Sequence, residues 1–422
     1  MDRSTLLFDW NIAAGAETFE WASARVAVQD ETLRDGAQGA SVIDPPVGDK
    51  RTLLHLTAAL GVHSANLGFP AAGVRATADV QALALEIAAA RLPLTATCAA
   101  RTILEDIRPI IDITQTSGVP IEIGLFIGSS PIRQAVEGWT LDDMLRRVEA
   151  AVSYAVTAGQ ATMFVTEDTT RTSPETLTAL HSAAITSGAR RVCLCDTVGH
   201  ATPAGVSRLV RFVRAQVGPE VAIDWHGHRD RDLGLANCLA AIEAGANRVH
   251  ATALGLGERV GNVAMETLLL NLCLLGAHHA DLTGVPAYAS HAARIYGVPI
   301  PAGQPLVGDD AFATGTGVHA AAIAKARAAG DAWLADHVYS AFPAGLVGRA
   351  QSVRVAPFSG HANVRWWLAD HGYDASDAEL VDTILAAAKA SDHALGDEEI
   401  SSIARRAGRN GTPYGLPRTR GV

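Results

Sequence analysis

From residue 25 onward, short apolar runs alternate with longer stretches in which apolar residues recur at helical spacing. The short runs are residues 26–29, 64–67, 94–98, 120–126, 162–165, 191–195, 221–224 and 248–251. The helix-like stretches lie near residues 48–60, 77–90, 102–117, 140–158, 173–187, 202–217, 232–245 and 262–276. This order indicates strands that alternate with helices.

Eight strand–helix alternations over about 250 residues match the length of a (β/α)8 TIM barrel. An open, doubly wound sheet is the alternative, but it normally carries a dinucleotide fingerprint after its first strand. Asp35-Gly36-Ala37-Gln38 stands at that place instead. Thr140, Ser173 and Thr202 supply N-cap signals for three of the helices. The pattern therefore favours an α/β protein built on a (β/α)8 barrel.

The same rhythm divides the chain into three parts. Residues 1–24 have no clear periodicity and are interpreted as an irregular N-terminal arm. Residues 25–277 form the predicted barrel. From residue 278 a proline-containing linker leads into helical stretches and a Gly/Arg/Pro-rich tail. We therefore predict a linker and mainly helical C-terminal subdomains over residues 278–422.

Composition narrows the class of protein. The chain has 422 residues, 48% of them hydrophobic, and a formal net charge of −10. The negative charge argues against nonspecific nucleic-acid binding. No apolar run approaches the ~18 residues of a membrane span, and the N-terminus lacks the order of a signal peptide. Five scattered cysteines suggest no disulfide framework. These features predict a cytoplasmic enzyme that binds neither nucleic acid nor membrane.

Polar residues gather after the predicted strands. In a TIM barrel this is where chemistry is expected, because the carboxyl ends of all eight strands meet at one face. The candidates, in chain order, are Arg34, Asp35, Asn66, Ser129, Glu167, Thr197, His226, His228, Arg229 and Asn262. Their convergence predicts a polar site at that face.

A metal site is the first function that these residues suggest. His226 and His228 are two positions apart on an extended segment, so both imidazoles point the same way. Barrel closure brings Asp35, at the end of the first strand, beside them. Asn262 would supply or orient a further ligand. Two nitrogens plus oxygens suit Mg²⁺, Mn²⁺ or Zn²⁺, with positions left open for substrate.

Such a site can chelate a 2-oxo acid through its carboxylate and keto oxygens. Arg34 would stabilise the alkoxide that forms when a nucleophile attacks the keto carbon. Thr197 offers a hydroxyl to the substrate carboxylate, and Glu167 can hold a proton or orient a ligand. His319 and Tyr339 lie outside the barrel segment. A lone histidine in a loop is more often structural or exposed than catalytic, so residue type alone leaves their role open.

Five motifs in this order resemble the DRE-TIM metallolyases, and most closely the 2-isopropylmalate, homocitrate and citramalate synthases. They are Asp30-x-Thr32-Leu33-Arg34-Asp35-Gly36-x-Gln38, Gly68-Phe69-Pro70, Asp196-Thr197-Val198-Gly199-x-Ala201-Thr202-Pro203, His226-x-His228 and Gly255-x-Gly257-Glu258-Arg259-x-Gly261-Asn262. The resemblance covers roughly residues 25–276, with a fainter match around Gly317–Ala320 and Ser359–Asn363.

The resemblance implies a Claisen-type condensation of acetyl-CoA with a 2-oxo acid, followed by thioester hydrolysis to a 2-hydroxy di- or tricarboxylate. It implies Asp35, His226 and His228 as metal ligands, with Asn262 near the ion and Arg34 as the electrophilic residue. His319 matches a histidine that assists proton abstraction from the acetyl methyl group and comes from a partner subunit in a swapped homodimer. Tyr339 would assist it.

The chain also departs from the family pattern. Arg229 replaces the usual asparagine after the second ligand histidine, and Asp232 replaces a glycine. Asn66 stands where a glutamate is expected before Gly-Phe-Pro, and Leu125 or Phe126 stands at the position of the usual histidine. We therefore hypothesise a substrate other than 2-oxoisovalerate, with a second anionic group near Arg229 and Arg231.

Three functions remain open at this point. The leading hypothesis is an acetyl-CoA-dependent synthase. The others are a C–C bond lyase of the hydroxymethylglutaryl-CoA lyase type and a non-catalytic binding descendant. The C-terminal region is too short for both accessory subdomains and a leucine-sensing domain, so feedback inhibition through such a domain is not expected.

Overall fold

The computed structural model describes residues 6–8, 11 and 19–409, in two compact units. The first comprises Met1–Asp281 and Ala287–Pro299, and the second comprises Leu282–Pro286 and Ile300–Val422. Each unit is considered by itself below. Most of the predicted N-terminal arm and the predicted frayed tail lie outside the described residues. Within the arm, Trp21–Ser23 forms a short 3-10 turn, η2. The Trp21 ring contacts the ring of Phe19, which precedes this turn.

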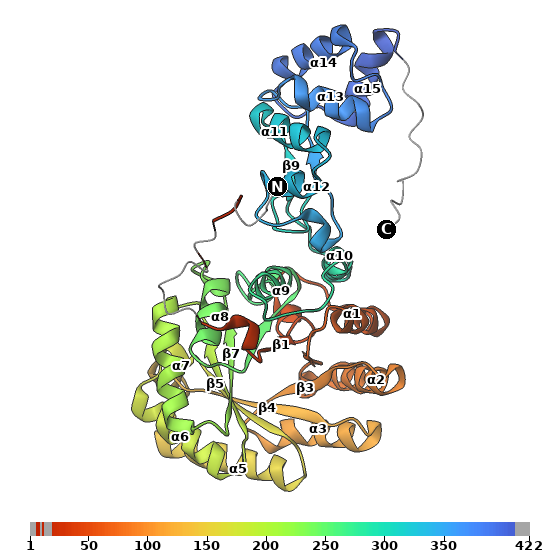
Figure 1. Ribbon diagram of the computed structural model, residues 1–422. Helices are drawn as coiled ribbons and strands as arrows, with labels where there is room; N and C mark the ends of the chain where they lie inside the picture. Colours follow the sequence, from red (N-terminus) through yellow and green to blue (C-terminus); the bar gives the residue numbers. More distant parts are fainter. Residues whose placement is uncertain (1–5, 9–10, 12–18, 410–422) are drawn as a thin grey trace. The chain divides into compact units, whose positions relative to one another are not determined.

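The described part of the first unit is built on eight parallel strands that close into a barrel in sequence order (Figure 1). They are β1 (Ala27–Asp30), β2 (Ser64–Asn66), β3 (Thr95–Arg101), β4 (Ile121–Gly128), β5 (Thr162–Glu167), β6 (Arg191–Asp196), β7 (Ala222–Gly227) and β8 (Arg248–Ala251). β8 pairs with β1, with His250 opposite Gln29, and this closes the barrel. The predicted TIM barrel is confirmed.

Helices surround the strands in the order that the periodicity predicts (Figure 1). They are α1 (Val47–Ala59), α2 (Val74–Ala90), α3 (Leu104–Ser117), α5 (Leu141–Thr157), α6 (Pro174–Thr186), α7 (Pro203–Val217), α8 (Gly234–Glu243) and α9 (Met265–Leu274). One short helix, α4 (Pro131–Glu137), is not foreseen. Its seven residues are too few to show a helical repeat, although Ser130 caps it through the Arg133 N–H.

The three predicted N-caps begin their helices as expected. Thr140 accepts a hydrogen bond from the Asp143 N–H, and the Asp143 side chain bonds back to Thr140, which makes a complete capping box. Ser173 and Thr202 each accept an N–H three residues on, and a proline follows both. Ser173 and Thr202 start α6 and α7 shortly after the ends of β5 and β6, whereas Thr140 starts α5 after the intervening helix α4.

The inside of the barrel is polar at its centre and apolar around it. Asp224 on β7 and Arg248 on β8 are buried and joined by an ion pair of 2.6 Å. Arg191 on β6 also pairs with Asp224, at 2.5 Å, and Glu122 on β4 pairs with Arg248. Because each buried charge has a partner, the network is compatible with the surrounding core.

Helix α10 (Val285–Tyr296) contributes two buried tyrosines to the first unit. The Tyr288 hydroxyl donates to the Asp30 carboxylate at 2.8 Å, and the Tyr296 hydroxyl donates to the Thr32 carbonyl at 2.9 Å. These bonds hold the turn that follows β1, from which Arg34 and Asp35 project.

The second unit is mainly helical, with one small parallel sheet. Its elements are β9 (Ala313–Thr314), α11 (Gly317–Ala328), α12 (Ala332–His337), β10 (Ser352–Val353), α13 (His361–Asp370), α14 (Ala378–Ala390) and α15 (Asp397–Arg406). Val364, Trp367, Leu380, Ile384 and Ile400 form the centre of an apolar core shared by the last three helices.

Candidate metal centre and pocket

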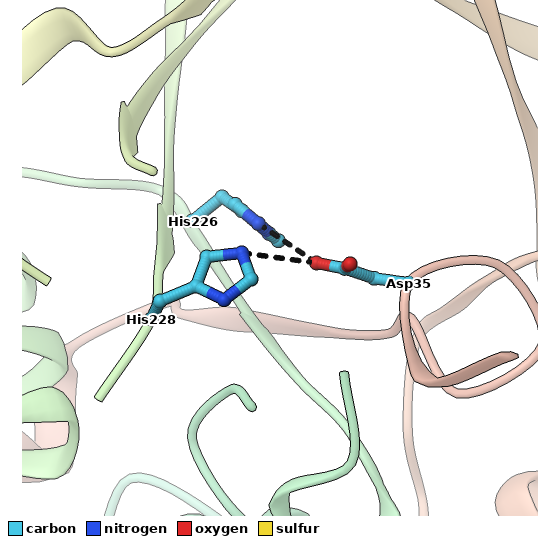
Figure 2. A group of neighbouring side chains, drawn as sticks. All are labelled: Asp35, His226 and His228. Atoms are coloured by element: carbon cyan, nitrogen blue, oxygen red, sulfur yellow. Dashed lines mark ion pairs between the residues drawn. The ribbon is translucent and has the colours of Figure 1, made fainter. Parts of the chain in front are cut away.

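Asp35, His226 and His228 form one buried cluster at the C-terminal face of the barrel (Figure 2). Asp35 Oδ2 lies 3.1 Å from His226 Nε2 and 3.4 Å from His228 Nε2. The three candidate ligand atoms are within 4.8 Å of one another. The convergence that the sequence predicts for these residues is therefore present in the structure.

Local structure explains the geometry. His226 belongs to β7, and His228 continues the extended segment, with its N–H bonded to the Asp196 carbonyl at 3.1 Å. Because side chains two positions apart on extended backbone share a side, both rings face the barrel axis. Asp35 sits at the start of a 3-10 turn, and its N–H bonds the Glu31 carbonyl at 2.8 Å.

The electrostatics favour the forms that bind a metal. Burial opposes ionisation of Asp35, but Arg34 and the two histidines outweigh it, so the Asp35 pKa lies well below its ordinary value. Burial lowers the pKa of His226, which keeps its imidazole neutral. An ionised carboxylate and a neutral imidazole are ready to coordinate a cation.

Two further observations fit a cation here. Asp35 Oδ2 is buried and has no hydrogen-bond donor among the described residues. An oxygen and two nitrogens around one point suit a divalent ion that keeps positions open for substrate. The three residues therefore fit the divalent metal that the sequence predicts.

Asn262 is buried beside the cluster, in a tightly folded glycine loop. It forms a backbone bridge with His228, and its Nδ2 donates to the Leu256 carbonyl at 3.0 Å. A Cβ on Gly257, whose φ is +148°, would lie 2.2 Å from Asn262 Nδ2, so the loop requires glycine there. Asn262 thus packs the loop against His228, and its role as a metal ligand stays a prediction.

A cavity of about 340 Å³ opens beside the cluster. It is lined by Glu31, Arg34, Asp35, Gln38, Asn66, Phe69, Ala99, Gly124, Phe126, Met163, Val165, Glu167, Cys193, Cys195, Thr197, His226, His228, His250, Glu258 and Arg259. Arg34, Asn66, Glu167 and Thr197 therefore share one pocket with the metal cluster, as the sequence predicts.

Glu167 and Thr197 have environments that suit proton transfer and anion binding. Burial raises the pKa of Glu167, and the partly exposed Arg133, 3.4 Å away, opposes that shift only in part. Thr197 Oγ1 accepts the Asp168 N–H at 2.8 Å, so its own hydroxyl hydrogen remains to be donated.

Ser129 and Arg229 do not reach the pocket, contrary to expectation. The Ser129 hydroxyl bonds the Glu167 carbonyl and the Thr172 hydroxyl, both at 2.8 Å. Arg229 Nε donates to the Val260 carbonyl at 2.9 Å, and Arg231 donates to the His200 carbonyl. These side chains stabilise loops, and no substrate-binding role is proposed for them.

The pocket's own arginines are also paired. Arg34 lies 2.7 Å from Glu31, and Arg259 lies 2.7 Å from Asp230. Arg259 also donates to the Thr197 carbonyl. Because each guanidinium already has a carboxylate partner, neither arginine brings an unpaired positive charge for a second anionic group on the substrate.

Of the two candidates for the usual histidine position at the end of β4, Leu125 and Phe126, Phe126 is the one that faces the pocket. Leu125 is fully buried and does not line the pocket, whereas Phe126 does and lies edge-on to Phe69 at 6.1 Å between ring centroids. The usual histidine position is therefore apolar in this chain.

His319 and Tyr339 belong to the second unit. Their rings stack with centroids 3.9 Å apart, and both side chains are exposed. His319 lies in the first turn of α11, and Tyr339 follows α12. The structure brings these two residues together, and their predicted catalytic roles stay predictions.

Sequence reasoning missed Glu31 and His250, which are buried and line the pocket. Two signals in the sequence point to them: Glu31 precedes Arg34 by three residues, and His250 is a titratable residue within a predicted strand, residues 248–251. Cys193 and Cys195 are also buried and form part of the pocket wall.

The described residues contain no helix that combines the length and apolar character of a membrane span.

Comparison with known proteins places these features in a wider group. The HMGL-like family model matches residues 25–289. A probable 2-isopropylmalate synthase from Ignicoccus hospitalis is 34% identical over 308 residues, covering 72% of this chain and 74% of that protein. A homocitrate synthase from Methanopyrus kandleri is 34% identical over 301 residues, covering 71% and 73%.

Several other curated 2-isopropylmalate synthases are longer, and the chain spans only 58–60% of their length. Among solved structures, the HMG-CoA lyase from Brucella melitensis has a TM-score of 0.55 and 18% identity, covering 65% of this chain and 100% of that one. At this identity the likeness concerns the fold alone.

Proposed function

The chain belongs to the HMGL-like family, and on that premise we propose that it is a metal-dependent acyltransferase that condenses acetyl-CoA with a 2-oxo acid. The acetyl methyl carbon would bond to the keto carbon, and the keto oxygen would become a hydroxyl. Water would then release free CoA and leave a 2-hydroxy di- or tricarboxylate. The observation that carries this proposal is the buried cluster of Asp35, His226 and His228 beside Arg34.

The pocket residues have distinct proposed roles. A divalent cation held by Asp35, His226 and His228 would polarise the keto group of the 2-oxo acid. Arg34 would stabilise the negative charge that develops on the keto oxygen. Thr197 would donate its hydroxyl to the substrate carboxylate.

The proton on the acetyl methyl group needs a base. We propose His319, assisted by the stacked Tyr339 and supplied by a partner subunit in a homodimer with a swapped C-terminal region. General acid–base assistance of this kind contributes typically ~10²–10⁴-fold. Glu167, whose pKa is raised by burial, would hold or return a proton at the pocket wall.

The apolar part of the pocket lining bears on the choice of 2-oxo acid. Phe126, Met163 and Val165 belong to it, and the lining arginines are already in ion pairs. Burying an uncompensated substrate charge there would be costly. We therefore propose an uncharged side chain on the 2-oxo acid, and hence a 2-hydroxy dicarboxylate as the product, in place of the second anionic group that Arg229 suggested.

The test is release of free CoA from acetyl-CoA, followed with a thiol reagent across a panel of 2-oxo acids and divalent metals. Release that requires both a 2-oxo acid and a metal supports the proposal, and preference for an aliphatic acid over oxaloacetate supports the uncharged side chain. Cleavage of a hydroxyacyl-CoA without condensation would replace the synthase by a lyase. Metal binding without either reaction would overturn both.

A further inference from the structure

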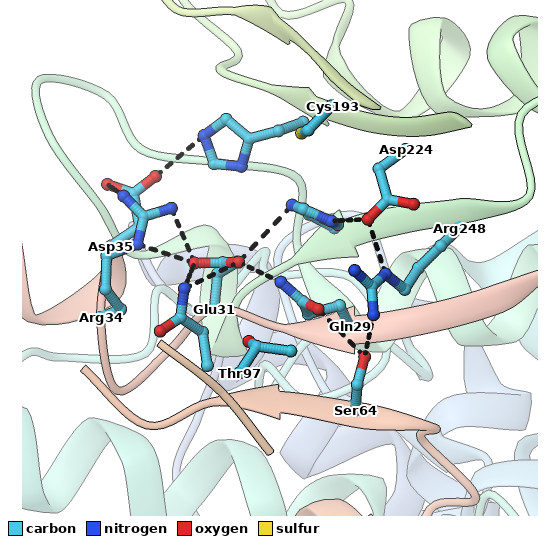
Figure 3. Close-up of polar contacts among 12 residues, drawn as sticks. Gln29, Glu31, Arg34, Asp35, Ser64, Thr97, Cys193, Asp224 and Arg248 are labelled. Carbon is cyan, nitrogen blue, oxygen red and sulfur yellow. Dashed lines mark hydrogen bonds and ion pairs between the residues drawn. The ribbon is translucent and has the colours of Figure 1, made fainter. Parts of the chain in front are cut away.

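We infer that Glu31 is the positioning residue for Arg34: it holds the guanidinium against the metal centre and anchors it to the buried ion network of the barrel. Glu31 follows β1 directly, is 1% exposed and lines the pocket. Figure 3 shows its carboxylate in the middle of the polar contacts that run from Arg34 to Arg248.

Arg34 is bound more closely by Glu31 than by Asp35. Arg34 Nε and Nη2 lie 2.8 and 2.7 Å from Glu31 Oε2, whereas the Nη1–Asp35 contact is 3.8 Å. Two contacts to one oxygen restrict a long side chain that otherwise has many rotamers. The direction in which Arg34 faces the pocket therefore depends on Glu31.

The Glu31 carboxylate is itself fixed from the other side. Gln29 Nε2 donates to Oε1 at 2.5 Å, and Asn66 Nδ2 lies 3.0 and 3.3 Å from the two oxygens. Burial opposes the charge on Glu31, but Arg34 and the nearby histidines outweigh it, and its pKa is lowered. The carboxylate thus remains ionised and immobile beside Arg34.

These partners lead into the barrel core. His250 Nδ1 lies 3.5 Å from Glu31 Oε1, and its Nε2 lies 3.0 Å from Asp224, which pairs with Arg248. Gln29 Oε1 accepts from Ser64 at 3.1 Å. Such a network of buried, mutually bonded groups has little freedom to move.

The position of Asn66 gives the inference a second support. The Asn66 amide contacts both carboxylate oxygens of Glu31. A longer side chain at residue 66 would therefore extend into the space that the Glu31 carboxylate occupies. The chain lacks the glutamate expected at residue 66 and has Glu31 next to it. The charge that faces Arg34 is therefore supplied by the residue that follows β1 rather than by β2.

The experiment compares four variants with the wild type. Glu31→Gln removes the charge, Asn66→Glu adds one, and the double variant moves the carboxylate from residue 31 to residue 66. Glu122→Gln is the matched control, because Glu122 belongs to the same buried network through Arg191 and Arg248, whereas Arg34 pairs with Glu31 and Asp35.

Two readouts report on Arg34. The first is the ¹⁵N NMR signal of its Nε–H, assigned by its loss in Arg34→Lys. We expect slow hydrogen exchange in the wild type, fast exchange in Glu31→Gln, and slow exchange again in the double variant. The second is turnover, where kcat should fall about 10²-fold in Glu31→Gln, the size expected for a misplaced catalytic group.

In the double variant kcat should be at least about tenfold higher than in Glu31→Gln. Glu122→Gln should change thermal stability but leave kcat within about threefold of the wild-type value. Metal affinity at Asp35, His226 and His228 should stay the same in every variant. If Glu31→Gln does not fold, Glu31→Asp replaces it in the test. This variant keeps the negative charge but moves the carboxylate away from Arg34 by one methylene, so hydrogen exchange at the Arg34 Nε–H should become faster.

An unchanged Nε–H exchange rate in Glu31→Gln, or in Glu31→Asp where that variant replaces it, overturns the inference, as does a kcat loss equal to that of Glu122→Gln. The kinetic readout rests on the proposed function. If the wild type condenses no 2-oxo acid, the proposed function fails, and the NMR readout still decides the role of Glu31.

Discussion

Asp35 Oδ2 lies 3.1 Å from His226 Nε2, although Asp35 follows β1 and His226 comes from β7. β8 stands between these strands and pairs with both, so barrel closure is what brings the two side chains together. A buried carboxylate oxygen without a donor, next to two imidazoles, is costly unless a cation completes the group.

The first prediction concerns that cation. His226→Ala should bind less than about a tenth of the divalent metal bound by the wild type, because one of three converging donors is lost. Metal content by mass spectrometry after dialysis checks this, and chelation of the wild type should abolish CoA release reversibly. His55→Ala, on the exposed face of α1, should bind like the wild type. Full metal occupancy in His226→Ala would exclude His226 as a ligand.

The second prediction separates Arg34 from the metal. Arg34→Ala should keep the metal and lose about 10²–10³-fold in kcat, because its charge acts mainly on the transition state. Steady-state kinetics with metal analysis checks it. Arg101→Ala is the control, since Arg101 is exposed and bonded to Asp106. Normal turnover by Arg34→Ala would show that another group stabilises the keto oxygen.

The third prediction is a pH dependence. Burial raises the pKa of Glu167 above its ordinary value of 4.5. If Glu167 acts as a base, it is inactive when protonated, so kcat/KM should fall on the acid side at a pH above 4.5. Glu167→Gln should lower kcat/KM and remove this acid limb, whereas Glu258→Gln, at the exposed rim, should retain it. An acid limb that persists in Glu167→Gln belongs to a different group.

The barrel and the metal cluster were predictable because both depend on periodic features. Strand–helix alternation identifies the fold, and the fold requires that residues after different strands meet at one face. The spacing of His226 and His228 then determines that both rings share a side.

The contacts of single loop side chains were not predictable. Arg229 was expected beside the substrate because of its position in sequence, but its guanidinium turns to the Val260 carbonyl. The role of Glu31 was not predicted because it depends on contacts with residues distant in sequence. Asn66 and His250 come close to Glu31 only because of the register of β1 with β2 and β8. Such contacts follow from tertiary packing, which no local pattern encodes.

The fourth prediction tests the buried network as a source of stability. Arg248→Met should destabilise the protein by about 3–5 kcal/mol, because Asp224 and Glu122 lose a buried counter-charge. Urea unfolding measures it. The pKa of Asp224 is lowered in the folded protein, chiefly by Arg248 acting against burial. Its contribution is therefore present above the unfolded value of 3.8 and is lost as pH falls, so the effect of the variant should shrink at acid pH.

Arg75→Met is the control for Arg248→Met, because Arg75 forms an exposed pair with Asp44. It should cost less than about 1 kcal/mol. Equal losses in the two variants would mean that the buried network adds nothing beyond a surface ion pair.

The last prediction asks whether His319 serves the pocket of its own chain or that of a partner. His319→Ala and Asp35→Asn should each be nearly inactive, since one lacks the proposed base and the other a metal ligand. If His319 acts across a homodimer, mixed dimers of the two variants contain one pocket with both groups intact. Co-expression with two different affinity tags isolates those mixed dimers, and their activity should reach about half that of the wild type. An inactive mixed dimer would place His319 and Asp35 of the same chain in one active site. If the protein sediments as a monomer, no partner subunit can supply His319.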